Sequence, residues 1–218
     1  MRQRDLCHRC LKPRVTCYCG DVVSFRTRED LQMVILQHPL ERKKTISTAR
    51  MAHLCIENSR IISGNQFDGY AEVERLLSDP NHDCVILYPG LNSVNLSEDK
   101  GALDTLYRPG KKLVVFVIDG TWLKARQMMR RSENLQQLPQ ICFTPGQVSQ
   151  YKFRKQPEEF CVSTIEAIHQ VLAILDPKAD ASILLKLFNA MVEKQLEFAV
   201  NKPKKAESPS IRSELSQR

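Results

Sequence analysis

Four cysteines stand within thirteen residues near the start of the chain, at Cys7, Cys10, Cys17 and Cys19. Thiolates at such paired close spacings can hold one tetrahedral Zn2+, and few apolar side chains are available nearby to order the segment otherwise. Four sulfur ligands leave no open coordination position, so the expected metal is structural. The alternatives are disulfides, which are rare in the cytosol, and free thiols. We therefore expect a four-cysteine zinc-binding module over residues 1–20.

A carboxylate ends the longest apolar run of the chain. Six large apolar residues at 113–118 stop at Asp119, which is followed by Gly120, Thr121 and Trp122, the only tryptophan. Such a run predicts a strand buried on both faces, and open α/β sheets bind ligands beyond the carboxyl ends of their strands. Asp119 is therefore a candidate functional residue, or alternatively a cap of the following helix. Trp122 is either a ligand contact or a core residue.

The rest of the chain alternates strand and helix patterns. Expected strands cover 31–37, 59–63, 84–88, 113–118 and a short 140–143. Expected helices cover 45–54 with Thr45 as N-cap, 70–77, about 121–131, 163–175 with Ser163 as N-cap and Glu166 at the capping-box position, and 181–199. This alternation predicts an α/β domain with a largely parallel sheet over residues 21–200. The Lys, Ser and Pro-rich segment 201–218 is expected to be a flexible basic tail.

Composition and charge limit the classes of function. A chain of 218 residues that is 42% hydrophobic and 26% charged can form one domain with a sizeable core. It has no run of transmembrane length and no secretion signal, so we expect a cytoplasmic protein without a membrane partner. The net charge of +7 arises from +4 at residues 1–20 and +3 at 201–218, while the middle is neutral. Basic clusters at 121–131 and 150–155 contrast with an acidic one at 68–83, which favours nucleic acid binding over a merely solvated surface.

Three further motifs follow or precede expected elements, and each alone has a plain structural account as a charged helix start, a Pro-Gly turn or a capping box. They are His38-Pro39-Leu40-Glu41, Leu87-Tyr88-Pro89-Gly90 and Ser163-Thr164-Ile165-Glu166-Ala167. Together with the four cysteines, the Asp119–Trp122 motif and the segment 151–157, they resemble the DTW-domain family, which is similar to the tRNA-uridine aminocarboxypropyltransferases. The resemblance runs from Cys7 to about Ala199, and the compact layout is most like the bacterial enzyme that modifies the tRNA variable loop.

The resemblance implies an S-adenosylmethionine-dependent transferase. Such an enzyme moves the 3-amino-3-carboxypropyl group to N3 of a uridine and releases methylthioadenosine. The implied fold is SPOUT-like, with a knotted C-terminal cofactor region, and the implied catalytic residues are Asp119, Thr121 and Trp122. Asp119 is a candidate general base for N3, because uridine N3 is a weak acid. Its alternative roles are to orient the substrate or to hold the ammonium of the cofactor.

The remaining expected sites follow from the same resemblance and from charge. Cofactor contacts are expected from Leu87, Pro89, Gly90, Ile118, Gly120, Val162, Ser163 and Thr164. Phosphate contacts are expected from Lys44, Arg50, Lys124, Arg126, Arg154 and Lys155. His38 and Glu41 are alternatively expected to fix the turn after the first strand. The expected partner is tRNA and the expected state is a monomer; the competing functions are a SPOUT RNA methyltransferase and a non-catalytic zinc-knuckle RNA-binding protein.

Overall fold

The molecule is built on one parallel sheet covered on both faces. The computed structural model describes residues 5–42, 44, 46–98, 101, 106–144 and 162–200. Six strands lie in the order β2-β1-β5-β3-β6-β4, and all neighbouring strands are parallel. The strands are β1 Leu31–Gln37, β2 Arg60–Ser63, β3 His82–Leu87, β4 Val94–Asn95, β5 Lys112–Asp119 and β6 Gln140–Cys142. The predicted α/β class with a parallel sheet is confirmed.

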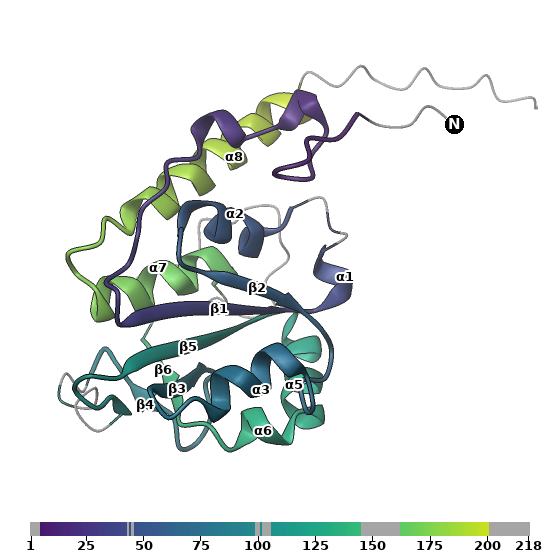
Figure 1. Cartoon of the computed structure of the whole chain (residues 1–218). Coiled ribbons are helices and arrows are strands. Elements are labelled where there is room, and N and C mark those ends of the chain that lie inside the picture. The colour runs from purple at the N-terminus through teal and green to yellow at the C-terminus, as the bar shows by residue number, and fades with distance from the viewer. Residues whose placement is uncertain are drawn as a thin grey trace, which may run out of the picture.

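Helices form a layer on each face of this sheet (Figure 1). One layer holds α2, α7 and α8, and the other holds α3, α5 and α6. The helices are α1 Pro39–Arg42, α2 Thr48–Cys55, α3 Ala71–Ser78, α5 Trp122–Arg131, α6 Glu133–Gln136, α7 Thr164–Leu175 and α8 Ser182–Val200, with short 3-10 turns at Arg14–Thr16 and Cys19–Asp21. Two hydrophobic cores result, one under each layer.

The apolar run of β5 is explained by these two cores. Successive side chains of a strand point to opposite faces. Leu113, Val115 and Val117 therefore join the core under α2, α7 and α8. Val114 and Phe116 join the core under α3 and α5. All five are at most 2% exposed, so a continuous apolar run is required here rather than an alternating one.

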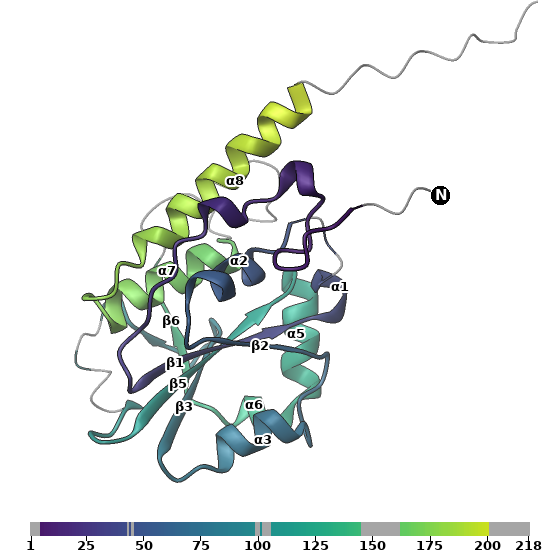
Figure 2. The same ribbon diagram turned by 45° about the horizontal axis from the view of Figure 1, so that its top comes forward.

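The carboxyl ends of β1 and β5 form the point where the chain direction switches. From β1 the chain continues into α2 on one face, and from β5 it continues into α5 on the other face (Figures 1 and 2). The register places Gln37, the last residue of β1, beside Asp119, the last residue of β5. A crevice between two such strands is where open α/β sheets bind ligands.

Several element boundaries differ from the sequence expectation. The second helix begins at Thr48 and is capped by Ser47, whose side chain accepts a hydrogen bond from the Arg50 backbone. The predicted N-cap at Thr45 is therefore wrong, since the cap lies two residues later, at Ser47. Thr45 itself lies outside the described residues. Ser163 is the predicted N-cap of α7 and forms a capping box with Glu166. The two-residue β4 and the single-turn α1 and α6 were not predicted.

The cysteine-rich start packs against the body of the fold rather than standing apart. Cys10 and Tyr18 are 3% and 1% exposed and belong to the core under α2, α7 and α8. Arg50 Nη1, in the first turn of α2, donates to the carbonyl oxygen of Arg9 at 3.4 Å. Lys194 of α8 forms an ion pair with Asp21. Among the helices that the structure describes, none has the length and apolar character needed to cross a membrane.

Candidate functional site

Asp119 is held between two segments that are far apart in the sequence. It is 7% exposed, and each of its carboxylate oxygens accepts a hydrogen bond. Gln37 Nε2 donates to Oδ2 at 2.8 Å, and Thr164 Oγ1 donates to Oδ1 at 2.6 Å. The second distance is typical of a charge-assisted O–H···O bond. The three side chains fix one carboxylate orientation where β1, β5 and the start of α7 meet.

The helix-cap alternative for Asp119 is wrong. Thr121 occupies the N-cap position of α5, and its side chain makes no capping hydrogen bond. The carboxylate of Asp119 instead points to Gln37 and Thr164. Asp119 is therefore oriented by hydrogen bonds from two other segments, which suits a reactive group.

Trp122 lies outside both cores. Its side chain is 40% exposed, and its ring meets Tyr88 edge-on at a centroid distance of 6.2 Å. Tyr88 follows β3 and packs against the core under α3 and α5. The core alternative for Trp122 is therefore wrong: this residue presents an aromatic surface at the carboxyl edge of the sheet, close to Asp119 in the chain.

Gln37 belongs to the site although it was not among the predicted site residues. This side chain is 2% exposed and donates through Nε2 both to Asp119 and to Ser47 Oγ, the latter at 3.0 Å. Ser47 in turn caps α2, so one amide joins the end of β1, the end of β5 and the start of α2. A polar residue at the end of a mostly apolar strand was the available signal for Gln37.

The expected cofactor residues lie at the carboxyl edge of the sheet, near Asp119. Leu87 ends β3 and pairs with Val117 of β5, and Pro89 and Gly90 follow β3 at the same edge where Ile118 and Gly120 lie at the end of β5. The segment Val162–Thr164, which includes Ser163, enters the same edge with the start of α7, because Thr164 contacts Asp119. The structure thus brings together segments from three parts of the sequence.

Two glycines are packed closely at this edge. A Cβ on Gly90 would lie 2.3 Å from Gln140 Oε1, and a Cβ on Gly120 would lie 3.2 Å from the Cβ of Lys124. The close approach to Lys124 places the turn after β5 directly against the first turn of α5. Gly120 therefore has a packing role in addition to any ligand contact.

Glu41 forms ion pairs with two of the three lysines that were expected to contact phosphate. Its carboxylate is almost buried and lies 2.7 Å from Lys44 Nζ and 2.9 Å from Lys124 Nζ. Burial alone would raise the pKa of Glu41, but the hydrogen bonds from both lysines outweigh it and lower that pKa. The carboxylate of Glu41 therefore partly neutralises the positive charges of Lys44 and Lys124. Nearby, burial and the charge of Lys124 lower the pKa of His38.

The other expected phosphate contacts differ in their surroundings. Arg50 is tied to the Arg9 backbone. Arg126 is exposed on α5 and has no ion-pair partner within the described ranges. Arg154 and Lys155 lie outside the described residues. Lys44 and Lys124 are thus committed to Glu41, whereas Arg126 points its charge toward solvent.

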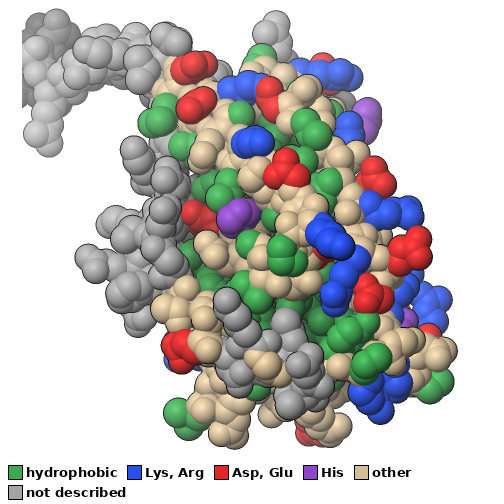
Figure 3. Space-filling view, turned by 90° about the vertical axis from the view of Figure 1, so that its left-hand side faces the viewer, with side chains coloured by type: hydrophobic (Ala, Val, Ile, Leu, Met, Phe, Trp, Pro, Cys, Tyr) green, Lys and Arg blue, Asp and Glu red, His purple; other side chains and the backbone are tan. Residues whose placement is uncertain are grey.

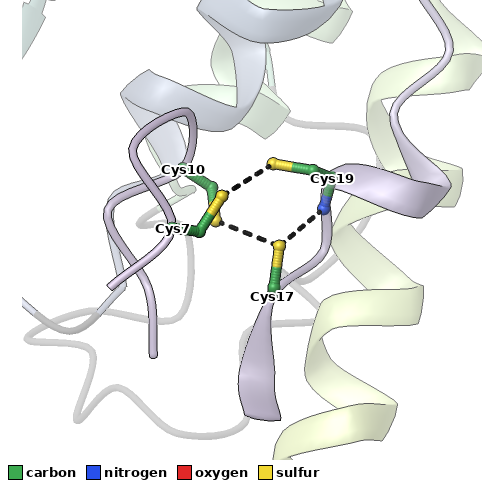
Figure 4. Close-up of side chains that lie close together, drawn as sticks. All are labelled: Cys7, Cys10, Cys17 and Cys19. Carbon is green, nitrogen blue, oxygen red and sulfur yellow. Dashed lines mark hydrogen bonds between the residues drawn. The ribbon is translucent and has the colours of Figure 1, made fainter. Parts of the chain in front are cut away.

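The four cysteines of the N-terminal module point toward one another (Figure 4). Their sulfur atoms all lie within 4.8 Å of one another, with 3.7 Å between Cys7 and Cys19 and 3.6 Å between Cys10 and Cys17. A tetrahedral zinc with bonds of about 2.3 Å has sulfur–sulfur edges of about 3.8 Å. No disulfide joins any of the described cysteines. The arrangement can hold one metal ion.

The surroundings of the sulfur cluster match an anionic metal centre. Backbone hydrogen bonds from Cys10 and then Arg9 lower the pKa of the Cys7 thiol to about 6, whereas burial raises the pKa of the Cys10 and Cys19 thiols. Lys12 is 4% exposed, and its Nζ has no hydrogen-bond partner among the described residues. Four thiolates around Zn2+ carry two net negative charges, and a buried ammonium beside them would offset that charge.

The opposite edge of the sheet has a different character. In Figure 3, which shows this side, basic and acidic side chains are interspersed. Arg108 and Lys111 pair with Asp83, and Arg28 pairs with Asp30. A shallow hollow of about 420 Å3 lies here, and none of the predicted site residues lines it. Its lining residues are Glu29, Asp30, Asn81, His82, Tyr107, Gly110, Lys111 and Lys112.

Comparisons with known proteins agree with the motif pattern. A family model described as the DTW domain matches residues 4–196. The chain is 31% identical over 201 residues to tRNA-uridine aminocarboxypropyltransferase 2 of Drosophila melanogaster, covering 89% of this chain and 76% of the relative. It is 28% identical over 177 residues to the Macaca fascicularis protein of the same name, covering 80% of this chain and 58% of the relative. It is 24% identical over 213 residues to tRNA-uridine aminocarboxypropyltransferase A of Arabidopsis thaliana, covering 88% and 80%. No solved structure gives a significant match.

Proposed function

The chain belongs to the DTW-domain family, and on this basis we propose that it is a tRNA-uridine aminocarboxypropyltransferase. The relatives that bear this name match over 80–89% of the chain. The observation that supports the assignment within the molecule is the preformed Asp119 carboxylate at the switch point of the sheet. S-adenosylmethionine is the proposed donor and a uridine of the tRNA variable loop the proposed acceptor.

The groups at the carboxyl edge suit this donor. S-adenosylmethionine carries a positive sulfonium, an ammonium, and a flat apolar adenine. Asp119 supplies a fixed anion, while Leu87 and Ile118 supply partly buried apolar surface on adjacent strands. The segment from Val162 to Thr164 brings the start of α7 to the same edge. We propose that a SPOUT-like knot in the C-terminal region encloses the donor here.

The main task of the enzyme in this reaction is to position the donor, because the sulfonium is already reactive. A sulfonium makes all three attached carbons electrophilic, so the enzyme must aim one methylene at the nucleophile, in line with the departing sulfur. The bond from N3 to that methylene forms as the carbon–sulfur bond breaks and methylthioadenosine leaves. N3 also loses its proton. We propose that Asp119 accepts the N3–H hydrogen bond and then this proton, and that Gln37 and Thr164 hold the carboxylate in the required orientation.

The N-terminal cysteines have a separate, structural role in this proposal. Cys7, Cys10, Cys17 and Cys19 hold Zn2+, and Lys12 offsets the charge of the thiolates. The bound metal supplies folding free energy and no reactive position. We propose three parts of the chain: this module at 1–20, the catalytic domain at 21–200 and a basic tail at 201–218. We also propose a cytoplasmic location.

The nucleoside that is released tests the proposed function. Purified protein is incubated with unmodified tRNA and S-adenosylmethionine, and the small products are separated. Methylthioadenosine is the expected product. S-adenosylhomocysteine would indicate a methyltransferase instead, and the absence of both products from a tRNA-binding protein would indicate a non-catalytic RNA-binding function.

A further inference from the structure

The outer face of α5 combines an exposed aromatic ring with exposed arginines. Trp122 is 40% exposed and Leu123 is 60% exposed at the start of this helix. Arg126, Arg130 and Arg131 are exposed along the rest of it. The opposite side of α5 is buried through Ala125, Met128 and Met129. The helix is therefore anchored on one side and presents a mixed aromatic and basic surface on the other.

The helix itself carries no acidic side chain that could balance these charges. Residues 121–131 contain no acidic residue. None of Arg126, Arg130 and Arg131 forms an ion pair with any part of the chain that the structure describes. Lys124, on the same helix, is instead paired with Glu41. An uncompensated row of guanidinium groups is the electrostatic signature of a phosphate-binding surface.

The spacing of these side chains suits a single strand. Trp122, Arg126 and Arg130 are separated by four residues each, which places them on neighbouring turns about 6 Å apart along the axis. Consecutive phosphates of an extended strand are separated by a similar distance. Trp122 stands at the end of the helix closest to Asp119, and Tyr88 supports it from the edge. An aromatic ring beside basic groups is how proteins bind unpaired nucleotides.

We propose that α5 guides the substrate RNA strand into the site. A base stacks on Trp122, and the phosphates that follow it contact Arg126 and Arg130. This inference rests on the proposed function, since it takes tRNA as the substrate, and it gives Trp122 a stacking role rather than a catalytic one. It also explains why the arginines of α5 face solvent while the lysines near Glu41 are held in place.

Trp122 is the only tryptophan of the chain, so its fluorescence reports on this contact in the unaltered protein. Unmodified tRNA should quench the emission in a saturable way, with the same Kd as filter binding in the absence of donor. Tight binding of tRNA without quenching would overturn the stacking contact. Trp122→Ala should weaken binding about 10-fold, and Trp122→Phe should recover part of the loss.

The phosphate contacts are tested through the salt dependence of binding. For Arg126→Ala/Arg130→Ala, the slope of log K against log salt should become shallower by about 1.4, which corresponds to two contacts to a single strand. The matched control is Arg75→Ala/Lys178→Ala, which removes two exposed bases elsewhere and should change the slope much less. Equal changes of this slope in the two double variants would overturn the proposed RNA contacts along α5.

These outcomes are separable from a failure of the proposed function. Quenching and an altered slope in a protein that transfers no group would contradict the transferase assignment and leave the α5 surface in place. Aminocarboxypropyl transfer with no quenching and an unaltered slope would overturn the α5 surface alone. A wild-type protein that binds no tRNA would overturn it as well.

Discussion

The contact between Thr164 and Asp119 gives the sharpest prediction for the reaction. Thr164→Val replaces the hydroxyl with a methyl group of similar size and removes the 2.6 Å hydrogen bond to Oδ1. A hydrogen bond to a charged group contributes about 1.5–3 kcal/mol. If the orientation of Asp119 matters in the transition state, kcat/KM for group transfer should fall by about 10- to 100-fold.

A mutant cycle separates this effect from a general disturbance of the site. Thr164→Ser keeps the hydroxyl and should retain most of the activity. In an Asp119→Asn background, Thr164→Val should cause little further loss, because the carboxylate that it orients is absent. The assay is the rate of methylthioadenosine release with saturating tRNA. Wild-type activity in Thr164→Val, or the same fold-loss in both backgrounds, would refute the role assigned to this contact.

Three further predictions concern stability and ligand contact. Removing the metal by chelation, or Cys17→Ser, should lower the melting temperature of the whole chain, because Cys10 belongs to the core under α2, α7 and α8. An unchanged melting curve would contradict a structural metal. Gly90→Ala should lower the free energy of unfolding in urea by only about 1 kcal/mol, because the end of the Gln140 side chain can rotate away. The same change should weaken donor binding. Unaltered donor binding would show that Gly90 is not part of the cofactor site. Glu41→Gln should cost about 1–3 kcal/mol at pH 7. The pKa of Glu41 is lowered from 4.5 in the folded protein. The wild type should therefore have the larger free energy of unfolding above pH 4.5, and this difference from Glu41→Gln should disappear as the pH falls through the folded pKa. A difference that persists at lower pH would contradict the ion-pair explanation.

The parts of the fold that depend on local pattern could be predicted. The apolar run of β5 predicted a strand buried on both faces, and the start of α7 was recognised from Ser163 and Glu166. The two residues of β4 form too short a segment to show a periodicity. The start of α2 was misplaced because Thr45 and Ser47 are both chemically suitable caps, and the second also receives a hydrogen bond from Gln37.

The parts of the site that depend on strand order could not be predicted. The sequence indicated Asp119 but not its partners, because β1 and β5 are neighbours in space while other strands lie between them along the chain. The Gln37–Asp119 hydrogen bond joins residues 82 positions apart, and the Lys124–Glu41 bond joins residues 83 positions apart. Both contacts follow from register and packing, which no local pattern encodes.

One isotope experiment tests the proposed transfer at Asp119 most directly. The donor S-adenosylmethionine carries one isotope in its methyl group and a second in its aminocarboxypropyl arm, and the tRNA nucleosides are then analysed by mass spectrometry. We predict that only the isotope of the arm enters a uridine, and that Asp119→Ala abolishes this transfer while tRNA affinity stays nearly unchanged. Methyl isotope in the tRNA, or full transfer by Asp119→Ala, would contradict the proposal.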